Sequence, residues 1–307
     1  MGNKPAFSQR HPAIFGFLII IAAVALFTGA MAVFHFLGPE EDGVASLIGG
    51  ESLGQVNIEG EIKASEDIVA FVKRLRENDD VKGVLIRVDS PGGAFGPSQE
   101  IYQAIKRLSE EKPVVASFSS VAASGGYYAA CPARLIYSNP GAITGSIGVL
   151  SQYANFQELM GKLGVSYQSF TSGELKDAGS PFKPMTPAQK AYIEALIADL
   201  ADQFTSAVVE NRHLSEESRR FIADGRAMTG RAAKEIGLVD ELGGREEALN
   251  ALKKLCGLKG KITVIKGPEV KEDWLKTLTS ALNLPEPETL AEIARLLRAA
   301  RAPGLQF

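Results

Sequence analysis

The chain has 307 residues, 45% hydrophobic and 22% charged, and its 33 basic and 36 acidic side chains leave a formal charge of −3. This is the composition of a globular protein, and the near balance of charge argues against a dedicated nucleic-acid binder, which would carry a basic surplus. Two cysteines, Cys131 and Cys256, are too few for a disulfide framework and belong to no CxxC motif. We therefore expect no metal site and no cofactor.

An apolar stretch near the N-terminus predicts a membrane-spanning helix. Residues 13–37 contain no Asp, Glu, Lys or Arg, and about 20 mostly apolar residues suffice to cross the hydrocarbon layer. Lys4 and Arg10 precede the stretch and acidic residues follow it, so the positive-inside rule keeps residues 1–12 in the cytoplasm and exports the rest. We expect a single-pass protein of the cell (inner) membrane. The alternative is a signal peptide cleaved after the Ala-Met-Ala at 30–32, but its apolar part would be unusually long.

After a short polar linker at 38–50, the pattern changes to that of one α/β domain over 51–260. Alternation of apolar and polar residues predicts a strand over 53–62, and β-branched runs predict buried strands over 81–88 and 113–118. Apolar residues at helical spacing predict one helix after Ser65 and another containing Ile101, Ile105 and Leu108; residues 134–137 resemble a further strand. Strands alternating with helices indicate an α/β fold with a largely parallel sheet.

The second half of the chain is mainly helical by pattern. This applies to residues 186–253, in which Pro187 suits the first turn of a helix. Residues 262–265 are a candidate for the last strand. The C-terminal tail, 261–307, has one strong element, an amphipathic helix over 289–301.

A glycine-rich turn, Asp-Ser-Pro-Gly-Gly at 89–93, follows the buried strand 81–88. Parallel sheets present ligands at the carboxyl ends of their strands, so a site is expected here. Paired glycines allow a backbone N–H to approach a ligand closely, as an oxyanion-binding donor requires. An ordinary tight turn accounts for the same residues equally well.

Ser124 lies among small residues just beyond the strand 113–118. A strand-to-helix turn at this point would expose its hydroxyl, and the positive end of the following helix would favour an oxyanion. The arrangement is similar to a nucleophile elbow, although the G-x-S-x-G pattern is absent. Taken alone, a serine before a helix favours the other interpretation, that Ser124 only caps the helix, because serine is a preferred capping residue.

A nucleophilic serine needs a base, and the chain has only three histidines, His11, His35 and His213, none in a suitable context. A Ser-His-Asp triad is therefore disfavoured, and a Ser-Lys pair is the remaining common arrangement. A lysine acts as a base only when it is shielded from water. Lys176, in a loop of small residues at 171–181, is the candidate, although the pattern alone favours a solvated loop lysine, since lysine is rarely buried.

Together these motifs resemble the signal peptide peptidase A family of serine proteases, peptidase family S49, in its short membrane-anchored form with a single repeat. The resemblance extends from about residue 54 to 257 and fades after 267. The matching stretches, in chain order, are VDSPGG (88–93), ASGGYYAA (123–130), NPGAITGSIGV (139–149), SGELKDAGSP (172–181) and ADGRAMTGRAAKEIGLVDELGG (223–244).

The resemblance implies roles for particular residues. Ser124 corresponds to the nucleophile, Lys176 to the general base and Ser146 to the residue that orients this lysine. The backbone N–H groups of Gly93 and Gly125 correspond to the oxyanion hole. The family also implies a ClpP/crotonase-like α/β fold, a spiral of ββα units, behind the N-terminal transmembrane helix.

The family further implies partners. These are hydrophobic peptides such as cleaved signal peptides, membrane lipid, and further copies of the chain in a homo-oligomeric ring whose serine and lysine come from adjacent protomers. Phe95, Tyr127 and Tyr128 lie beside the motifs as candidates to line an apolar substrate groove, although helix packing explains the tyrosines equally well.

Two other functions stay open. A crotonase-like acyl-CoA enzyme would use the same glycines, but it would require a glutamate base and a cytoplasmic domain. A membrane-anchored scaffold would keep the fold without the chemistry.

Overall fold

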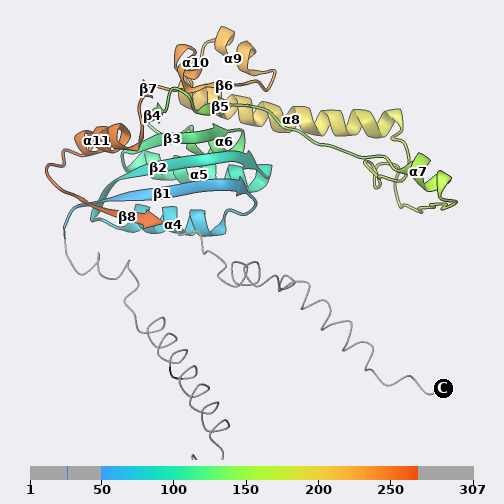
Figure 1. Cartoon of the computed structure of the whole chain (residues 1–307), viewed down its shortest axis with the longest axis horizontal. Coiled ribbons are helices and arrows are strands. Elements are labelled where there is room, and N and C mark those ends of the chain that lie inside the picture. Colours follow the sequence, from blue (N-terminus) through green and yellow to red (C-terminus); the bar gives the residue numbers. More distant parts are fainter. Residues whose placement is uncertain (1–25, 27–49, 269–307) are drawn as a thin grey trace, which may run out of the picture.

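The structure is a computed structural model that describes residues 50–268 and Leu26 (Figure 1). Within this part of the chain, no helix is both long enough and apolar enough to cross a membrane. The expected spanning helix at 13–37, apart from Leu26, and the expected tail helix at 289–301 lie outside the described residues.

One eight-stranded sheet forms the centre of the described domain, with the spatial order β6-β5-β3-β2-β1-β8 and a branch in which β4 pairs with β3 and β7 with β4. Neighbouring strands run parallel except for β5 and β6, which are antiparallel. This confirms the expected α/β class with a largely parallel sheet. The strands are β1 (Ser52–Ile62), β2 (Val81–Gly93), β3 (Val114–Ala123), β4 (Leu135–Ser138), β5 (Ile143–Gly145), β6 (Ala227–Thr229), β7 (Glu241–Leu242) and β8 (Thr263–Gly267).

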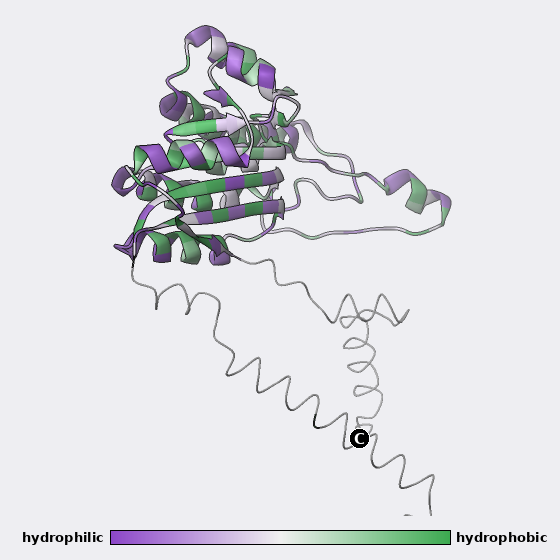
Figure 2. Ribbon diagram, turned by 60° about the vertical axis from the view of Figure 1, so that its left-hand side comes forward, coloured by the Kyte–Doolittle hydropathy of each residue, from purple (hydrophilic) through white to green (hydrophobic). Residues whose placement is uncertain are grey.

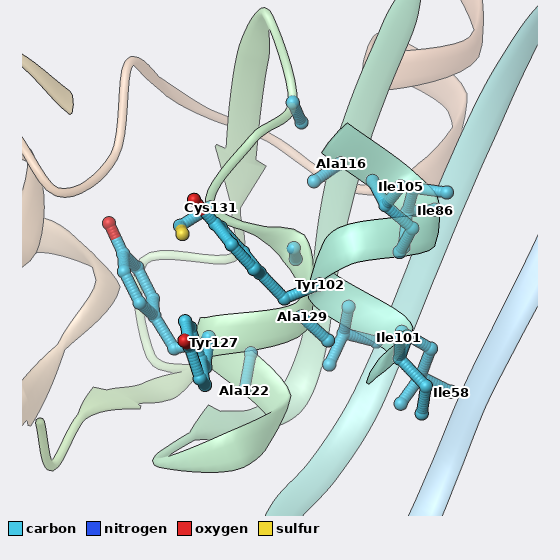
Figure 3. Packing of buried hydrophobic residues seen from close by; sticks show 14 of the residues in the cluster. Ile58, Ile86, Ile101, Tyr102, Ile105, Ala116, Ala122, Tyr127, Ala129 and Cys131 are labelled. Carbon is cyan, nitrogen blue, oxygen red and sulfur yellow. The ribbon is translucent and has the colours of Figure 1, made fainter. Parts of the chain in front are cut away.

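Helices pack on both faces of the sheet, and neighbouring residues of the central strands β2 and β3 enter different cores. Ile86 of β2 belongs to the larger core with α4, α5 and α6, whereas its neighbour Leu85 belongs to a smaller core with α11. Figure 3 shows part of the larger core, with side chains of α5 and α6 against the strands. The helices are α4 (Glu66–Glu77), α5 (Phe95–Glu111), α6 (Gly125–Ala130), α7 (Gln157–Lys162), α8 (Pro187–Arg212), α9 (Glu216–Ile222), α10 (Gly230–Glu235) and α11 (Arg245–Leu255).

Strand β2 is longer than its apolar run predicts. The expected turn at 89–93 is instead a bulged continuation of the strand, because the pairing with β1 shifts after Asp89 and resumes at Gly92. Gly92 has φ +95°, and a Cβ atom there would lie 2.6 Å from the backbone nitrogen of Gly125. Glycine is therefore required where β2 passes the start of α6.

Strand β3 is also longer than expected, and it changes partner along its length. Its first part, through Phe118, pairs with β4, and its last part, from Val121 to Ala123, pairs with β5. The extension brings the end of β3 beside the end of β2, where Ser90 pairs with Ala122. The sequence therefore locates these strands correctly but ends both of them too early.

The segment between β5 and α8 leaves the domain, and we call residues 150–186 the arm. It carries α7 and extends well away from the sheet (Figures 1 and 2). Helix α8, with 26 residues or about 39 Å, runs from the arm back to the domain. Phe204 and Val208 near its C-terminal end are buried, whereas Tyr192 and Leu196 nearer its start are exposed.

Tyr127 is a core residue. Its side chain is fully buried among those of the larger core (Figure 3). Its hydroxyl donates a 2.8 Å hydrogen bond to the backbone oxygen of Leu238. Burial raises the pKa of Tyr127 well above its ordinary value, so the phenol stays neutral and remains a donor. This bond ties α6 to the segment after α10.

Replacing Tyr127 by Phe removes this hydrogen bond while keeping the ring. We expect Tyr127→Phe to lower the free energy of unfolding by about 1 kcal/mol, the usual net contribution of a hydrogen bond. Urea unfolding followed by circular dichroism measures the change. The exposed Tyr192 provides the control, since Tyr192→Phe should leave stability unchanged; equal effects of the two substitutions would contradict the assignment.

Candidate active site

A cavity of about 640 Å³ opens where β2, β3 and β5 end. Its lining includes the four residues expected to supply the nucleophile, the oxyanion hole and the lysine-orienting group: Gly93 at the end of β2, Ser124 and Gly125 after β3, and Ser146 after β5. The volume is in the range of pockets that enclose small ligands or parts of a peptide. The ends of these strands thus bring together motifs that are more than 50 positions apart in the sequence.

Ser124 occupies the turn between β3 and α6 in an uncommon backbone conformation, φ 50° and ψ −124°. Its N–H donates to the oxygen of Gly145 at 2.9 Å, and its own carbonyl accepts the N–H of Tyr128 at 2.9 Å. Its side chain makes no capping hydrogen bond to α6. Ser124 therefore stands at the N-cap position without acting as a side-chain cap, which leaves its hydroxyl available at the cavity.

The glycines after Ser124 are fixed by close packing. A Cβ atom on Gly125 would lie 2.3 Å from the hydroxyl oxygen of Ser98, and one on Gly126 would lie 2.8 Å from the carbonyl oxygen of Ser90. Real side chains do not tolerate such separations. Glycine at both positions lets α6 start directly against β2 and α5, and this places Ser124 at the rim of the cavity.

Ser146 also has a left-handed backbone, with φ 51°, and it follows Gly145, whose carbonyl binds the N–H of Ser124. The N–H of Ser146 donates to the oxygen of Arg226 at 2.8 Å, beside the antiparallel pairing of β5 with β6. Two serines are therefore held at the same cavity through backbone hydrogen bonds around Gly145.

One wall of the cavity is aromatic. Phe95 of α5 and Phe204 of α8 both pack against Tyr128, with ring centroids 5.8 and 4.6 Å from that of Tyr128. Phe95 and Tyr128 line the cavity as the sequence suggested. Tyr127 does not, which corrects the expectation for this residue: the α6 backbone turns its ring into the core, toward Leu238.

Sequence reasoning did not identify Phe204 or Asp224, although both line the cavity. Phe204 lies on a long helix remote in sequence from the other residues, and no motif marks it. Asp224 begins a short turn whose Arg226 binds its carboxylate, and these hydrogen bonds lower the pKa of Asp224. The rim thus has a carboxylate that stays charged at neutral pH and is paired with a guanidinium.

Lys176 lies apart from these residues. It is exposed on the part of the arm that joins α7 to α8, and it is not among the residues that line the cavity. Its N–H donates to the oxygen of Gly173 at 3.1 Å within a series of tight turns. A single copy of the chain therefore brings Ser124, Ser146, Gly93 and Gly125 together, but it does not bring Lys176 to them.

Comparison with known proteins gives a consistent result. The family model described as peptidase family S49 matches residues 106–259. A Synechocystis protein named as a protease is 40% identical over 77% of this chain and 89% of its own length. The chloroplastic serine protease SPPA of Arabidopsis thaliana is 31% identical over 73% of this chain, and Protease 4 of Haemophilus influenzae is 35% identical over 65%. This chain matches 34% of the length of each of the last two proteins.

Among solved structures, a mutant of ClpP1 from Listeria monocytogenes aligns with 64% of this chain and 94% of its own, at 19% identity and a TM-score of 0.43. A mutant of the 1510-N membrane-bound stomatin-specific protease, solved with a substrate peptide, aligns with 76% of this chain and 100% of its own, at 19% identity and a TM-score of 0.45.

The family match covers half of the chain and includes Ser124, Gly125 and Ser146 of the cavity lining. The Synechocystis and Arabidopsis relatives, which match 77% and 73% of this chain, carry protease names, so an acyl-CoA enzyme is no longer a competing interpretation. The chain belongs to peptidase family S49 and is a serine protease.

Proposed function

We propose that this serine protease is a membrane-anchored endopeptidase in which Ser124 is the nucleophile and Lys176 the general base. The observation that carries the proposal is the state of Ser124. Its backbone is held at a positive φ at the edge of a partly aromatic cavity, and its side chain makes no capping hydrogen bond to α6. Strained residues of this kind persist where the surrounding structure fixes them, and they cluster at functional sites.

In this mechanism the neutral amine of Lys176 takes the proton of the Ser124 hydroxyl as the oxygen attacks the peptide carbonyl. The N–H groups of Gly93 and Gly125 stabilise the oxyanion, and Ser146 orients the lysine. The protonated lysine then gives its proton to the leaving amine, and an acyl-enzyme remains on Ser124. Water, deprotonated by the same lysine, then attacks the acyl-enzyme carbonyl. The ester bond breaks, the protonated lysine returns the proton to the Ser124 oxygen, and the second product leaves as the acid.

The base comes from a neighbouring copy of the chain in this proposal. Lys176 is exposed on the arm, whereas a lysine base must be shielded from water, so another surface has to cover it. The arm also exposes many large apolar side chains, as protein interaction sites do. They include Leu150, Phe156, Leu159, Leu163 and Phe170. A homo-oligomeric ring in which each arm reaches the cavity of the next protomer would satisfy both requirements.

The substrates we propose are hydrophobic peptides, such as cleaved signal peptides. The aromatic wall of Phe95, Tyr128 and Phe204 supports this choice, because it favours apolar side chains. Residues 13–37 would anchor the chain in the cell membrane, in contact with lipid, with the catalytic domain outside the cytoplasm. We also propose the ClpP/crotonase-like ββα spiral for the domain; the bent course of β3, which changes partner from β4 to β5, is consistent with it.

The first prediction concerns the two reacting groups. We expect Ser124→Ala and Lys176→Ala each to reduce hydrolysis of a leucine-containing peptide ester by several orders of magnitude, because nucleophile and base act as one unit. A fluorophosphonate probe should label the wild-type chain at Ser124. Both variants should be labelled far more slowly than the wild-type chain, if at all. Absence of labelling in the wild-type chain would instead support an inactive scaffold.

The second prediction concerns the origin of the base. If Ser124 and Lys176 meet across two protomers, Ser124→Ala and Lys176→Ala chains mixed and reassembled should recover part of the lost activity. Each mixed oligomer then contains sites with an intact serine facing an intact lysine. No recovery in oligomers shown by mass to contain both chains would mean that the pair forms within one chain.

The third prediction concerns the strain at Ser124. Glycine adopts a positive φ without the penalty of about 1–3 kcal/mol that other residues incur. Its greater freedom in the unfolded chain offsets about 0.4–1 kcal/mol of this. We therefore expect Ser124→Gly to be inactive but about 1 kcal/mol more stable than Ser124→Ala, by denaturant unfolding of the purified chain. Equal stability of the two variants would contradict the assigned strain.

A further inference from the structure

The turns that carry Lys176 are held by two side chains that do not line the cavity. We propose that Asp177 and Gln189 are positioning residues that clamp the lysine loop, residues 173–180, onto the start of α8 and so set the rate of the chemical step. This inference rests on the proposed role of Lys176, and the experiment below separates the two.

Gln189 is the first part of the clamp. It lies in the first turn of α8, and although its side chain is polar, only 2% of the residue is exposed. The side-chain nitrogen donates to the backbone oxygen of Glu174 and to the carboxylate of Asp177, both at 3.0 Å. The side-chain oxygen accepts the N–H of Thr186 at 3.1 Å. A buried amide is costly without partners, and this one uses both of its donor hydrogens on the lysine loop.

Asp177 is the second part. Its carboxylate accepts hydrogen bonds from Ser169 at 3.1 Å and Lys183 at 2.6 Å, as well as from Gln189. These partners come from the arm before the loop, from the arm after it, and from α8. The bond from Lys183 is the main cause that lowers the pKa of Asp177, so the carboxylate is charged at neutral pH.

The anchored groups lie on both sides of Lys176. The backbone oxygen of Glu174 is fixed two positions before it, and the side chain of Asp177 is fixed one position after it. Three backbone hydrogen bonds form the turns of the loop: from Lys176 to Gly173, from Ala178 to Leu175 and from Ser180 to Asp177. The backbone of Lys176 is therefore restrained while its side chain remains exposed, as a base that acts on another surface requires.

The clamp should affect catalysis more than substrate binding. Neither Asp177 nor Gln189 lines the cavity, whereas Phe204, near the other end of α8, does. Loosening the loop displaces the amine, and a displacement of about 1 Å can reduce a rate about 100-fold. A general disruption of α8 would instead disturb Phe204 and raise KM.

The test uses Gln189→Met in the full chain, since methionine keeps the length of the side chain and removes its hydrogen bonds. We expect kcat on a peptide ester to fall about 10- to 100-fold while KM changes less than about threefold. The oligomer mass should stay the same. Lys190→Met, at the exposed neighbouring position, is the matched control and should retain wild-type kcat.

A second variant guards against an effect on the start of the helix. Gln189→Met also removes the hydrogen bond from the Thr186 N–H to the Gln189 side chain, which is part of the capping box of α8. Asp177→Asn leaves this capping box intact and removes the charge that binds Lys183. We expect Asp177→Asn to lower kcat in the same way. Wild-type kcat in both variants, or a loss that appears mainly as a raised KM, would overturn the clamp.

The Lys176→Ala background separates this inference from the proposed function. If the clamp acts through the lysine, adding Gln189→Met to Lys176→Ala should slow labelling by the fluorophosphonate probe no further. A further loss of about tenfold or more would overturn the clamp as a lysine-positioning device. Wild-type labelling of Lys176→Ala alone would overturn the proposed base, whatever Gln189→Met does.

Discussion

The site depends on one constraint, the left-handed backbone of Ser124 at the junction of β3 and α6. The conformation is unfavourable in itself and is held by the hydrogen bond from its N–H to Gly145 and by the close approach of Gly92 to Gly125. The bulge in β2 and the extension of β3 both contribute to this constraint. They bring two strand ends and the start of a short helix close enough that only glycines fit between them, so the serine cannot relax into an ordinary cap.

The same constraint explains how the sequence could indicate so much of the cavity. Glycine is required at 92, 93, 125 and 126 because another segment of the chain lies too close for a Cβ atom. A single sequence shows the paired glycines themselves, although it does not show which segment approaches them. The β-branched runs likewise located the central strands, since a parallel strand is buried on both faces. Ser124 and Ser146 each lie next to such a glycine, which is why their surroundings were recognisable.

What could not be predicted arises from contacts between distant segments. The continuation of β2 beyond residue 88 depends on pairing with β1 after a register shift, and no pattern within β2 reveals it. Strands β6 and β7 have three and two residues, too few for a period to be seen. Tyr127 and Tyr128 are adjacent, chemically identical and both buried in the core, yet only Tyr128 also reaches the cavity wall, because α6 orients them differently. Phe204 reaches the cavity only because α8 returns from the arm.

The proposed catalytic groups come from two parts of the molecule, the edge of the buried sheet and the exposed arm, which are held in place in different ways. The nucleophile and the oxyanion donors of the proposed mechanism lie at the edge of a buried sheet, where packing of backbone against backbone determines their positions. The proposed base lies on an exposed arm that has no sheet to support it, so its geometry must come from side-chain hydrogen bonds. A buried glutamine and a carboxylate with three donors are a means of making a short, exposed series of turns behave as a rigid element.

Helix α8 carries this clamp near one end and Phe204 near the other. If each arm serves the cavity of the next protomer, α8 positions the proposed base of one site and forms part of the substrate wall of another. Rigidity of α8 would then couple the assembly of neighbouring sites without any contact between their substrates.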